Sequence, residues 1–563
     1  AVSIVAFCIV YIIVRRFVSM NKKRISALAL ALGMAIGSSA AMAAPESMID
    51  FSNLAFNDDT SPIEFSLYLD YDWYSVDTWG KDEVSQYITE TTGVSFDAYK
   101  SSDRSELGVL LAADDLPDVI FTDNLVQRFE DSDVCYPWDE LIEQYDPDFY
   151  TNANVGELEI LNNTAADGHI YTFKTHFHYW KDPLDYPSYG DAGLYVREDV
   201  LKQLGMTTAD IDSIEKLIEV FDMVNEKKAE LGIDVIYNPH PTWNNAISTY
   251  MGCKSGTWID NDGNAHTKWS DPAQKDYLLL MNKLYTKGYL YKDAYAVNPE
   301  NFFTLNRSGT VFSASYNTGL ASETNKIFFE NGMPEKEFNS IKEITYGGEH
   351  KRVTYDNGIG WSSCFISRSC DNPERAIKIM EFFKSPQGDA LTQWGIEGLH
   401  YTRDEEGHVI NTQYYYDKLA EDSASMGIGP WYLQGSGLGE GTKIASMMSQ
   451  TNATEQQLAW SKPQYDLLSY LKTTYKSVPY WYFARVSSDT DEYTIQTKLD
   501  SYWKNTTTSI IMAESAEAAE VLYDEMMQYM NDNGLGDLEA AMTANYQAQL
   551  PLYADYIAEN PID

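Results

Sequence analysis

Acidic side chains and aromatic rings are the residues of this chain that could do chemistry. The 563 residues include 84 Asp and Glu, 41 Tyr and 13 Trp. Two carboxylates can act as the acid and the base of a glycosidase, and aromatic rings offer flat faces to the C–H faces of sugars. No carboxylate pair stands out, whereas rings bunch at residues 68–79, 177–180 and around 243. This pattern favours carbohydrate binding, and a secreted glycan hydrolase stays open as the alternative.

Motifs for nucleotide, acyl-transfer and zinc-protease chemistry are absent from the sequence: it has no G-x-x-x-x-G-K-[ST], G-x-S-x-G or H-E-x-x-H. His176 and His178 could point to one side of a strand, but no third metal ligand is nearby. The D-x-D-G-N run at 260–264 resembles part of a calcium loop, yet Trp269 stands where that loop needs Glu. We therefore predict a plain turn there, no metal and no cofactor.

The formal net charge of −43 restricts the partners of the chain. Such an acidic surface repels nucleic-acid phosphates and anionic lipid, so nucleic acid is excluded as a partner. The charge also favours a neutral or cationic ligand. The alternative is that the acidity serves only solubility.

Alternating strands and helices must position these side chains. Strands are predicted at 63–69, 94–98 and 119–121, with helices at 82–92 and 102–113 between them; Gly93 ends the first helix and Ser102 caps the second. This order is typical of a parallel doubly wound sheet, in which ligands bind at the carboxyl ends of strands. A second such block begins near Gly193.

Loops after the predicted strands, together with the aromatic clusters, supply the candidate ligand contacts. Packing in the core or in a hinge is the alternative role for each ring, and Glu397 could instead bind backbone amides of its own loop. The candidates are Tyr74, Trp79, Asp123, Tyr179, Trp180, Trp243, Asn244, Tyr316, Asn317, Trp361, Glu397 and His400.

The sequence NPERA at 372–376, followed by SPQG at 385–388 and GIEGLHYT at 395–402, is its most distinctive part. Asn372 and Ser385 are N-caps, each followed by proline in the first turn, and Gly395 ends the second helix. Together with WGKD at 79–82, DLPDVI at 115–120 and GLYVREDVLKQLG at 193–205, this order closely resembles family 1 extracellular solute-binding proteins of ABC transporters, in their large lipoprotein-like branch of the maltose-binding-protein-like superfamily.

The resemblance implies an α/β, two-lobed periplasmic-binding-protein-like (type II) fold with a hinge and an interlobe cleft. Its lobes would comprise residues 62–180 with 355–410 and residues 181–354 with 411–563. The implied function is that of the substrate-binding component of an ABC importer, which captures an oligosaccharide or another neutral polyhydroxylated solute by cleft closure. The monomeric protein, itself no enzyme, would deliver this ligand to the permease transmembrane subunits. A peptide-binding member of the same transporter family is an alternative.

The first 43 residues read as a leader, with Met20 as the true start. Lys22, Lys23 and Arg24 form a basic n-region, 25–37 an apolar h-region, and 41–43 a small-x-small cleavage site. Residues 44–61 are predicted to be a flexible lead-in. No cysteine follows the h-region, so we expect an exported protein of the cell envelope, periplasmic or extracellular, without a lipid anchor.

Cysteines are too few for a disulfide scaffold and include no C-x-x-C pair. Cys364 and Cys370 could pair, but the apolar neighbours of Cys364 favour buried thiols.

Overall fold

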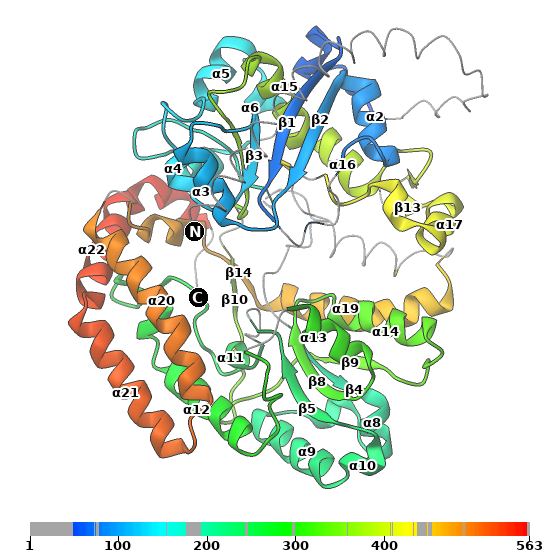
Figure 1. The fold of residues 1–563 in the computed structure, drawn as a ribbon, viewed down its shortest axis with the longest axis vertical. Helices are drawn as coiled ribbons and strands as arrows, with labels where there is room; N and C mark the ends of the chain where they lie inside the picture. Colours follow the sequence, from blue (N-terminus) through cyan, green and yellow to red (C-terminus); the bar gives the residue numbers. More distant parts are fainter. Residues whose placement is uncertain are drawn as a thin grey trace, which may run out of the picture. The chain divides into compact units, whose positions relative to one another are not determined.

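Two larger β-sheets organise the chain, each buried on both faces (Figure 1). The computed structural model describes residues 49–563 except 72–73, 75–77, 154, 176–192, 242–245, 296–298, 357–358, 406, 408, 432, 436–447, 449–452, 488–489 and 560–563. All described residues belong to one compact unit, Ile49–Asp563. The predicted leader lies outside the described residues.

The first sheet has the strand order β11-β3-β1-β2. As predicted, β1 (Ile63–Leu69) pairs in parallel with β2 (Val94–Lys100) and with β3 (Val119–Thr122), whereas β11 (Ser363–Ile366) returns antiparallel to β3. Side chains of successive residues alternate between two cores: Phe121 packs in one and Ile120 in the other. Burial on both faces explains the nearly continuous apolar runs of β1 and β3.

The second sheet has the order β5-β8-β4-β9. Strand β5 (Val235–Pro239) is parallel to β8 (Val311–Tyr316), while β4 (Gly193–Arg197) is antiparallel to both β8 and β9 (Phe338–Ile341). Val196 and Tyr195 again face different cores. Separate cores around each sheet make two lobes, joined through the parallel pair of β10 (Thr354–Asp356) and β14 (Tyr475–Ser477) (Figure 1).

Local capping signals set the helix ends of the first lobe. Helix α2 (Glu83–Thr92) begins where the Asp82 carboxylate accepts the Ser85 N–H at 2.7 Å and ends at Gly93, with φ of 74°. Helix α15 (Pro373–Lys384) and helix α16 (Pro386–Trp394) begin at the predicted caps Asn372 and Ser385. Helix α3 (Ser105–Ala112) differs from the prediction, because it follows Arg104 and is not capped by Ser102.

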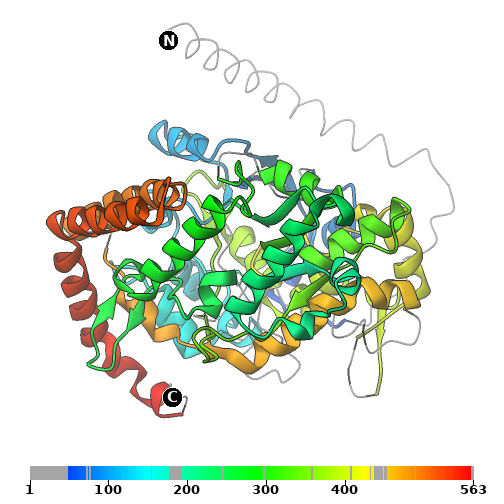
Figure 2. The ribbon, with the colours of Figure 1, turned by 90° about the horizontal axis from the view of Figure 1, so that it is seen from below.

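The C-terminal helices share the core of the second sheet, as Trp503, Met526 and Tyr546 pack in the same cluster as Leu194. Figure 2 shows the last of these helices, coloured deep orange to red, along one side of the molecule. The principal ones are α19 (Glu455–Thr474), η5 (Pro479–Ala484), α20 (Asp491–Ile511), α21 (Ala516–Asp532), α22 (Leu535–Gln549), η6 (Leu550–Tyr553) and α23 (Ala554–Glu559).

The remaining helices and hairpins connect these parts. In the first part of the chain they are η1 (Ala55–Asp58), α4 (Val126–Phe129), α5 (Trp138–Tyr145), α6 (Phe149–Asn152) and α7 (Glu157–Asn163). Around the second sheet they are α8 (Glu198–Gln203), α9 (Ile214–Glu226), α10 (Lys228–Leu231), α11 (Ala246–Tyr250), α12 (Ala273–Thr286), α13 (Pro299–Arg307) and α14 (Leu320–Glu330). The turn predicted at 260–264 joins β6 (Trp258–Ile259) to β7 (Ala265–His266), and β12 (Tyr401–Arg403) pairs with β13 (Val409–Asn411) before α17 (Gln413–Glu421).

Two segments pack differently from the sequence expectation. Phe51 and Phe56 of the predicted flexible lead-in are buried against Phe382 of α15, with ring centroids 5.6 and 5.7 Å away. Trp431 and Leu433, predicted in the second lobe, are buried in the first-sheet core. Both segments carry large apolar side chains, and burial in the first core removes them from water.

All four cysteines within the described residues are free and buried, as the sequence favoured. Burial raises the pKa of the Cys370 thiol to about 12, which keeps it protonated and unreactive at neutral pH.

Candidate functional site

In each sheet, the carboxyl end of one strand lies beside the first residue of the strand with which it pairs antiparallel. Ser363, the first residue of β11, stands opposite Thr122 at the end of β3, and Gly193, the first residue of β4, stands opposite Tyr316 at the end of β8. The segment that ends at Thr175 reaches the same end of the first sheet, because the Thr175 N–H donates to Ser362 O at 2.8 Å. Side chains after these strand ends therefore gather next to the segments that link the lobes.

A charged group, which we call the first strand-end group, follows the strands of the first sheet: Asp70 after β1, Arg104 after β2 and Asp123 after β3. Arg104 Nη2 donates to both aspartates, to Asp70 Oδ2 at 3.2 Å and to Asp123 Oδ1. Thr122 Oγ1 also donates to Asp70 Oδ2, at 2.7 Å. Of the three, only Asp123 was a predicted contact.

Asp70 is completely buried, and this burial raises the pKa of its carboxyl group. The hydrogen bond from Thr122 and the charge of Arg104 act in the opposite direction and stabilise the carboxylate. Asp70 Oδ1 has no hydrogen-bond partner among the described residues.

Trp361 adds an aromatic ring beside the charged group. Its ring meets the edge of Tyr71 at 5.6 Å, and Tyr71 in turn carries the Arg104 guanidinium over its face at 5.5 Å. Tyr71 is buried, whereas Trp361 is 40% exposed. Among the predicted rings that the structure describes, Trp361 is the most exposed.

An aromatic group, which we call the second strand-end group, follows the strands of the second sheet. His240 lies directly after β5, and its ring centroid is 4.5 Å from that of Tyr316 at the end of β8. Phe302 and Phe303 of α13 approach Tyr316 at 5.5 and 5.2 Å. Burial lowers the pKa of His240 to about 4, so its imidazole is neutral at pH 7. Asn317, also predicted, accepts the Tyr195 hydroxyl at its backbone oxygen, at 2.8 Å.

Several predicted contacts are placed in the interior instead. Trp79 is buried, donates Nε1–H to Thr89 Oγ1 at 2.8 Å and meets the Trp431 ring at 4.8 Å. Tyr74 is buried, and its hydroxyl donates to the backbone oxygen of Pro430. Both rings thereby attach the chain near residue 431 to the first lobe, which is the packing role that the sequence left open for Trp79.

The loop at residues 395–402, which follows α16, is fixed by a hydrogen bond within it and by a contact with Glu83 of α2. His400 is fully buried; its Nδ1 accepts the Ile396 N–H at 2.9 Å, and its Nε2 lies 2.8 Å from a Glu83 carboxylate oxygen. Burial lowers the pKa of His400, although the contact with Glu83 opposes this. Glu397 is also buried. We therefore reassign His400 and Glu397 from ligand contact to loop packing in this conformation.

Four predicted contacts, Tyr179, Trp180, Trp243 and Asn244, lie outside the described residues, as do His176 and His178. Among the described residues, no group of three His, Cys, Asp or Glu side chains could hold a metal ion. The sequence reasoning did not name Arg104, His240 or Phe303, and it placed Asp70 only at the start of a loop expected to face the ligand. Applying the strand-end rule to β2 would have found Arg104. After β5 the rule gave Trp243 and Asn244, whereas His240 lies directly after that strand.

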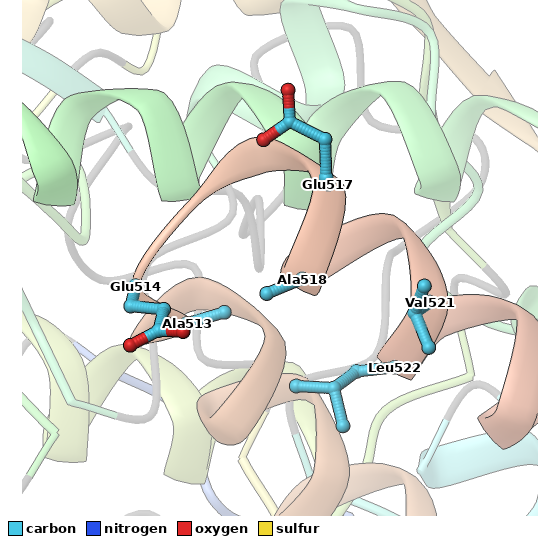
Figure 3. A pocket seen from close by; sticks show the side chains of 6 residues that line it. All are labelled: Ala513, Glu514, Glu517, Ala518, Val521 and Leu522. Atoms are coloured by element: carbon cyan, nitrogen blue, oxygen red, sulfur yellow. The ribbon is translucent and has the colours of Figure 1, made fainter.

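Two surface hollows contain none of these residues. The larger, of about 1180 Å³, lies between residues such as Leu111, Gln127 and Thr164 of the first lobe and Phe483 and Asn545 near the C-terminus. The smaller, of about 570 Å³, lies where α20 passes into α21. Figure 3 shows the Glu517 carboxylate pointing away from the apolar side chains of this hollow, whereas Glu514 lies beside Ala513.

Comparison with solved structures identifies the fold. The chain is similar to the Streptococcus pneumoniae ABC-transporter substrate-binding protein FusA in complex with kestose, with a TM-score of 0.64 at 16% identity over 87% of this chain and 100% of that one. It is also similar to the alginate-binding protein AlgQ2 without calcium ion, with a TM-score of 0.62 at 17% identity over 86% of this chain and 98% of that one. A third is an HMO-binding solute-binding protein of Bifidobacterium longum infantis, with a TM-score of 0.59 at 12% identity over 87% and 99%.

No protein-family model and no curated protein matches the chain. The structural likeness extends over nearly the whole length of each solved protein. The chain therefore has the two-lobed α/β fold of solute-binding proteins.

Proposed function

We propose that this protein is the substrate-binding component of an ABC importer for an oligosaccharide or another neutral polyhydroxylated solute. The observation that carries the proposal is the likeness to solute-binding proteins of this class, which include those described in complex with kestose and with Man5GlcNAc. The strand-end groups support it, because they combine hydrogen-bonding side chains with aromatic rings, as sugar sites require.

The mechanism that we propose is closure of the two lobes on the ligand. The first strand-end group and Trp361 bind one side of the solute, and the second strand-end group binds the other. Contacts to both groups form only when the lobes approach, so ligand binding shifts the equilibrium towards the closed state. The solute leaves chemically unchanged, since the protein binds it and does not act as an enzyme.

The lobe boundaries remain a proposal, with two changes. We assign Phe51 to Asp58 and the segment around Trp431 and Leu433 to the first lobe, because their apolar side chains are buried in its core. The remaining C-terminal helices stay with the second lobe, whose core they share.

We further propose that the protein is exported to the cell envelope and docks as a monomer on permease subunits. Among the described residues, no helix is both long and apolar enough to cross a bilayer. The predicted signal peptide supports export.

Calorimetric titration of the purified protein with a panel of oligosaccharides and peptides tests the proposal, combined with chromatography of each glycan after incubation. Saturable binding of a glycan without product is the expected result. Product formation would instead establish a glycan hydrolase, and binding of peptides alone would establish a peptide carrier.

A further inference from the structure

The smaller hollow, of about 570 Å³, lies where α20 passes into α21 and contains none of the strand-end residues. Val521 in its wall is 56% exposed, and Met512 at the end of α20 is 39% exposed. Neighbouring exposed apolar side chains with polar residues around them are typical of interaction surfaces. The hollow is lined by Ala513, Glu514, Glu517, Ala518, Val521 and Leu522 (Figure 3).

One face of α21 forms most of this surface. Residues four apart on a helix lie on the same face, so Val521 aligns with Glu517 one turn before it and with Glu525 one turn after it. Both glutamates are exposed. Ala518 and Leu522 lie beside this row and are partly buried against the core of the second sheet. A partner that covers Val521 would therefore meet carboxylates on either side.

The acidic residues of the last helices have few cations near them. Residues 505–563 contain 11 Asp and Glu but no Lys, Arg or His. Lys275 of α12 pairs with Glu520 and Asp524 of α21, at 3.0 Å each. These ion pairs compensate charge on the side of α21 that faces α12.

Three carboxylates around the hollow have no such compensation. Glu514, Glu517 and Glu525 form no ion pair with the residues that the structure describes. The helix dipole stabilises Glu517 in the first turn of α21, but not Glu525 further along the helix. These carboxylates repel nucleic acid, anionic lipid and a second copy of this acidic chain. The occupant that their charge fits is a segment of another protein in which an apolar side chain is flanked by lysine or arginine.

We propose that the junction of α20 and α21 is a docking surface for a basic segment of another protein. The segment inserts an apolar side chain into the hollow and pairs its cations with the surrounding carboxylates. Burial of the apolar side chain supplies affinity, and the carboxylates orient the segment and speed its association. The surface goes beyond the proposed function and does not depend on it.

Fluorescence anisotropy of three labelled peptides, titrated with the purified protein, tests the surface. The first peptide has two leucines flanked on each side by two basic residues; serines replace the leucines in the second, and glutamates replace the basic residues in the third. We expect the first to bind at least about tenfold more tightly than either of the others, because each of those lacks one kind of contact. Its Kd should rise with salt concentration.

Three outcomes would overturn the docking surface. Equal binding of the first and second peptides would show a general attraction to an acidic protein. Equal binding of the first and third would show a site for any apolar group. The third such outcome is that the first peptide does not bind.

Val521→Ser locates the binding at the hollow. It should weaken binding of the first peptide about fivefold, because the partner then covers a hydroxyl in place of two methyl groups. Val109→Ser, at a valine of α3 that is 65% exposed, is the matched control and should leave the Kd unchanged. Equal Kd values for the wild type and Val521→Ser would refute the assignment of the hollow.

Glu514→Gln tests the carboxylates at the hollow. It should weaken binding of the first peptide about threefold, the effect of one exposed charge contact. Glu230→Gln, at an exposed glutamate of α10, changes the net charge equally and is the control. Equal weakening by both variants would show that net charge alone attracts the peptide, and the docking surface would be refuted. Melting temperatures within a few degrees of the wild type confirm that the variants fold, and glycan titrations of the same variants report on the proposed function separately.

Discussion

The strand-end groups of the two lobes occupy equivalent places but differ in chemistry. In the first lobe, Arg104 joins two aspartates beside the half-exposed ring of Trp361. In the second lobe, a neutral His240 lies among the rings of Phe302, Phe303 and Tyr316. Hydrogen bonds from charged groups are directional, whereas ring faces are tolerant of position. We infer that the first lobe distinguishes ligands by the positions of their hydroxyl groups. The second lobe contributes aromatic contact area.

The lobes also differ in how their buried titratable groups make the free energy of unfolding depend on pH. The largest change in this free energy should come from the first lobe. Burial, reinforced by the nearby Glu381, raises the pKa of Asp146 to about 7. Its stabilising contribution is complete below the unfolded pKa near 4 and is lost as the pH rises to 7, by on the order of 3 kcal/mol. Asp146→Asn should remove this loss, measured by urea unfolding at pH 5 and pH 8.

The exposed Asp148 of the same turn provides the matched control, as Asp148→Asn. If Asp146→Asn and Asp148→Asn change the pH dependence equally, burial of Asp146 is not its cause.

In the second lobe the pH dependence should have the opposite sign. The pKa of His240 is lowered to about 4, so its contribution to stability is complete above the unfolded pKa near 6.5. It is lost as the pH falls from 6.5 to 4, by on the order of 2 kcal/mol. In His240→Phe the free energy of unfolding should change less between pH 6.5 and pH 4 than in the wild type. His350→Asn, at an exposed histidine, should leave this change as it is in the wild type. If the free energy of unfolding of His240→Phe fell with pH as steeply as that of the wild type, His240 would not be the cause of this pH dependence.

Trp361→Ala tests the ring of the first lobe. Loss of an exposed ring face should weaken glycan binding by about 2 kcal/mol, or roughly 30-fold in Kd, with little change in melting temperature. Trp460→Ala, at a ring of α19 that packs on Phe329, is the control in calorimetric titration. Equal affinities for wild type and Trp361→Ala would remove Trp361 from the site.

Phe303→Ala tests the ring surface of the second lobe and should have the smallest effect. Phe303 is partly buried against Tyr316, so its removal should weaken glycan binding by about 1 kcal/mol, or roughly fivefold. Phe329→Ala, at an exposed phenylalanine of α14, is matched in chemistry and lies elsewhere in the chain. A larger loss for Phe303→Ala than for Trp361→Ala would reverse the assignment of the two lobes.

Much of the fold could be predicted because its signals are local. Asp82 with Gly93 bounded α2, and Asn372 and Ser385 marked the starts of α15 and α16. A cap depends on residues within one turn, so a single sequence reveals it. The start of α3 was misplaced because Asp103, and not Ser102, accepts the Ser105 N–H.

The candidate site was only partly predictable. The strand-end rule identified Asp123 and Tyr316, since it depends on the order of strands and helices. It could not separate Trp361, which is exposed, from Trp79, which Trp431 covers from more than 300 residues away. Exposure of a ring depends on which distant segments pack over it.

By itself the sequence determined the helix caps, the parallel run β1 to β3 and the aromatic and acidic character of the loops, because these follow from neighbouring residues. Only the tertiary structure decided that Arg104 joins Asp70 to Asp123 and that His240 lies among rings. Those contacts bring together the ends of different strands, and the pairing of strands sets which ends meet.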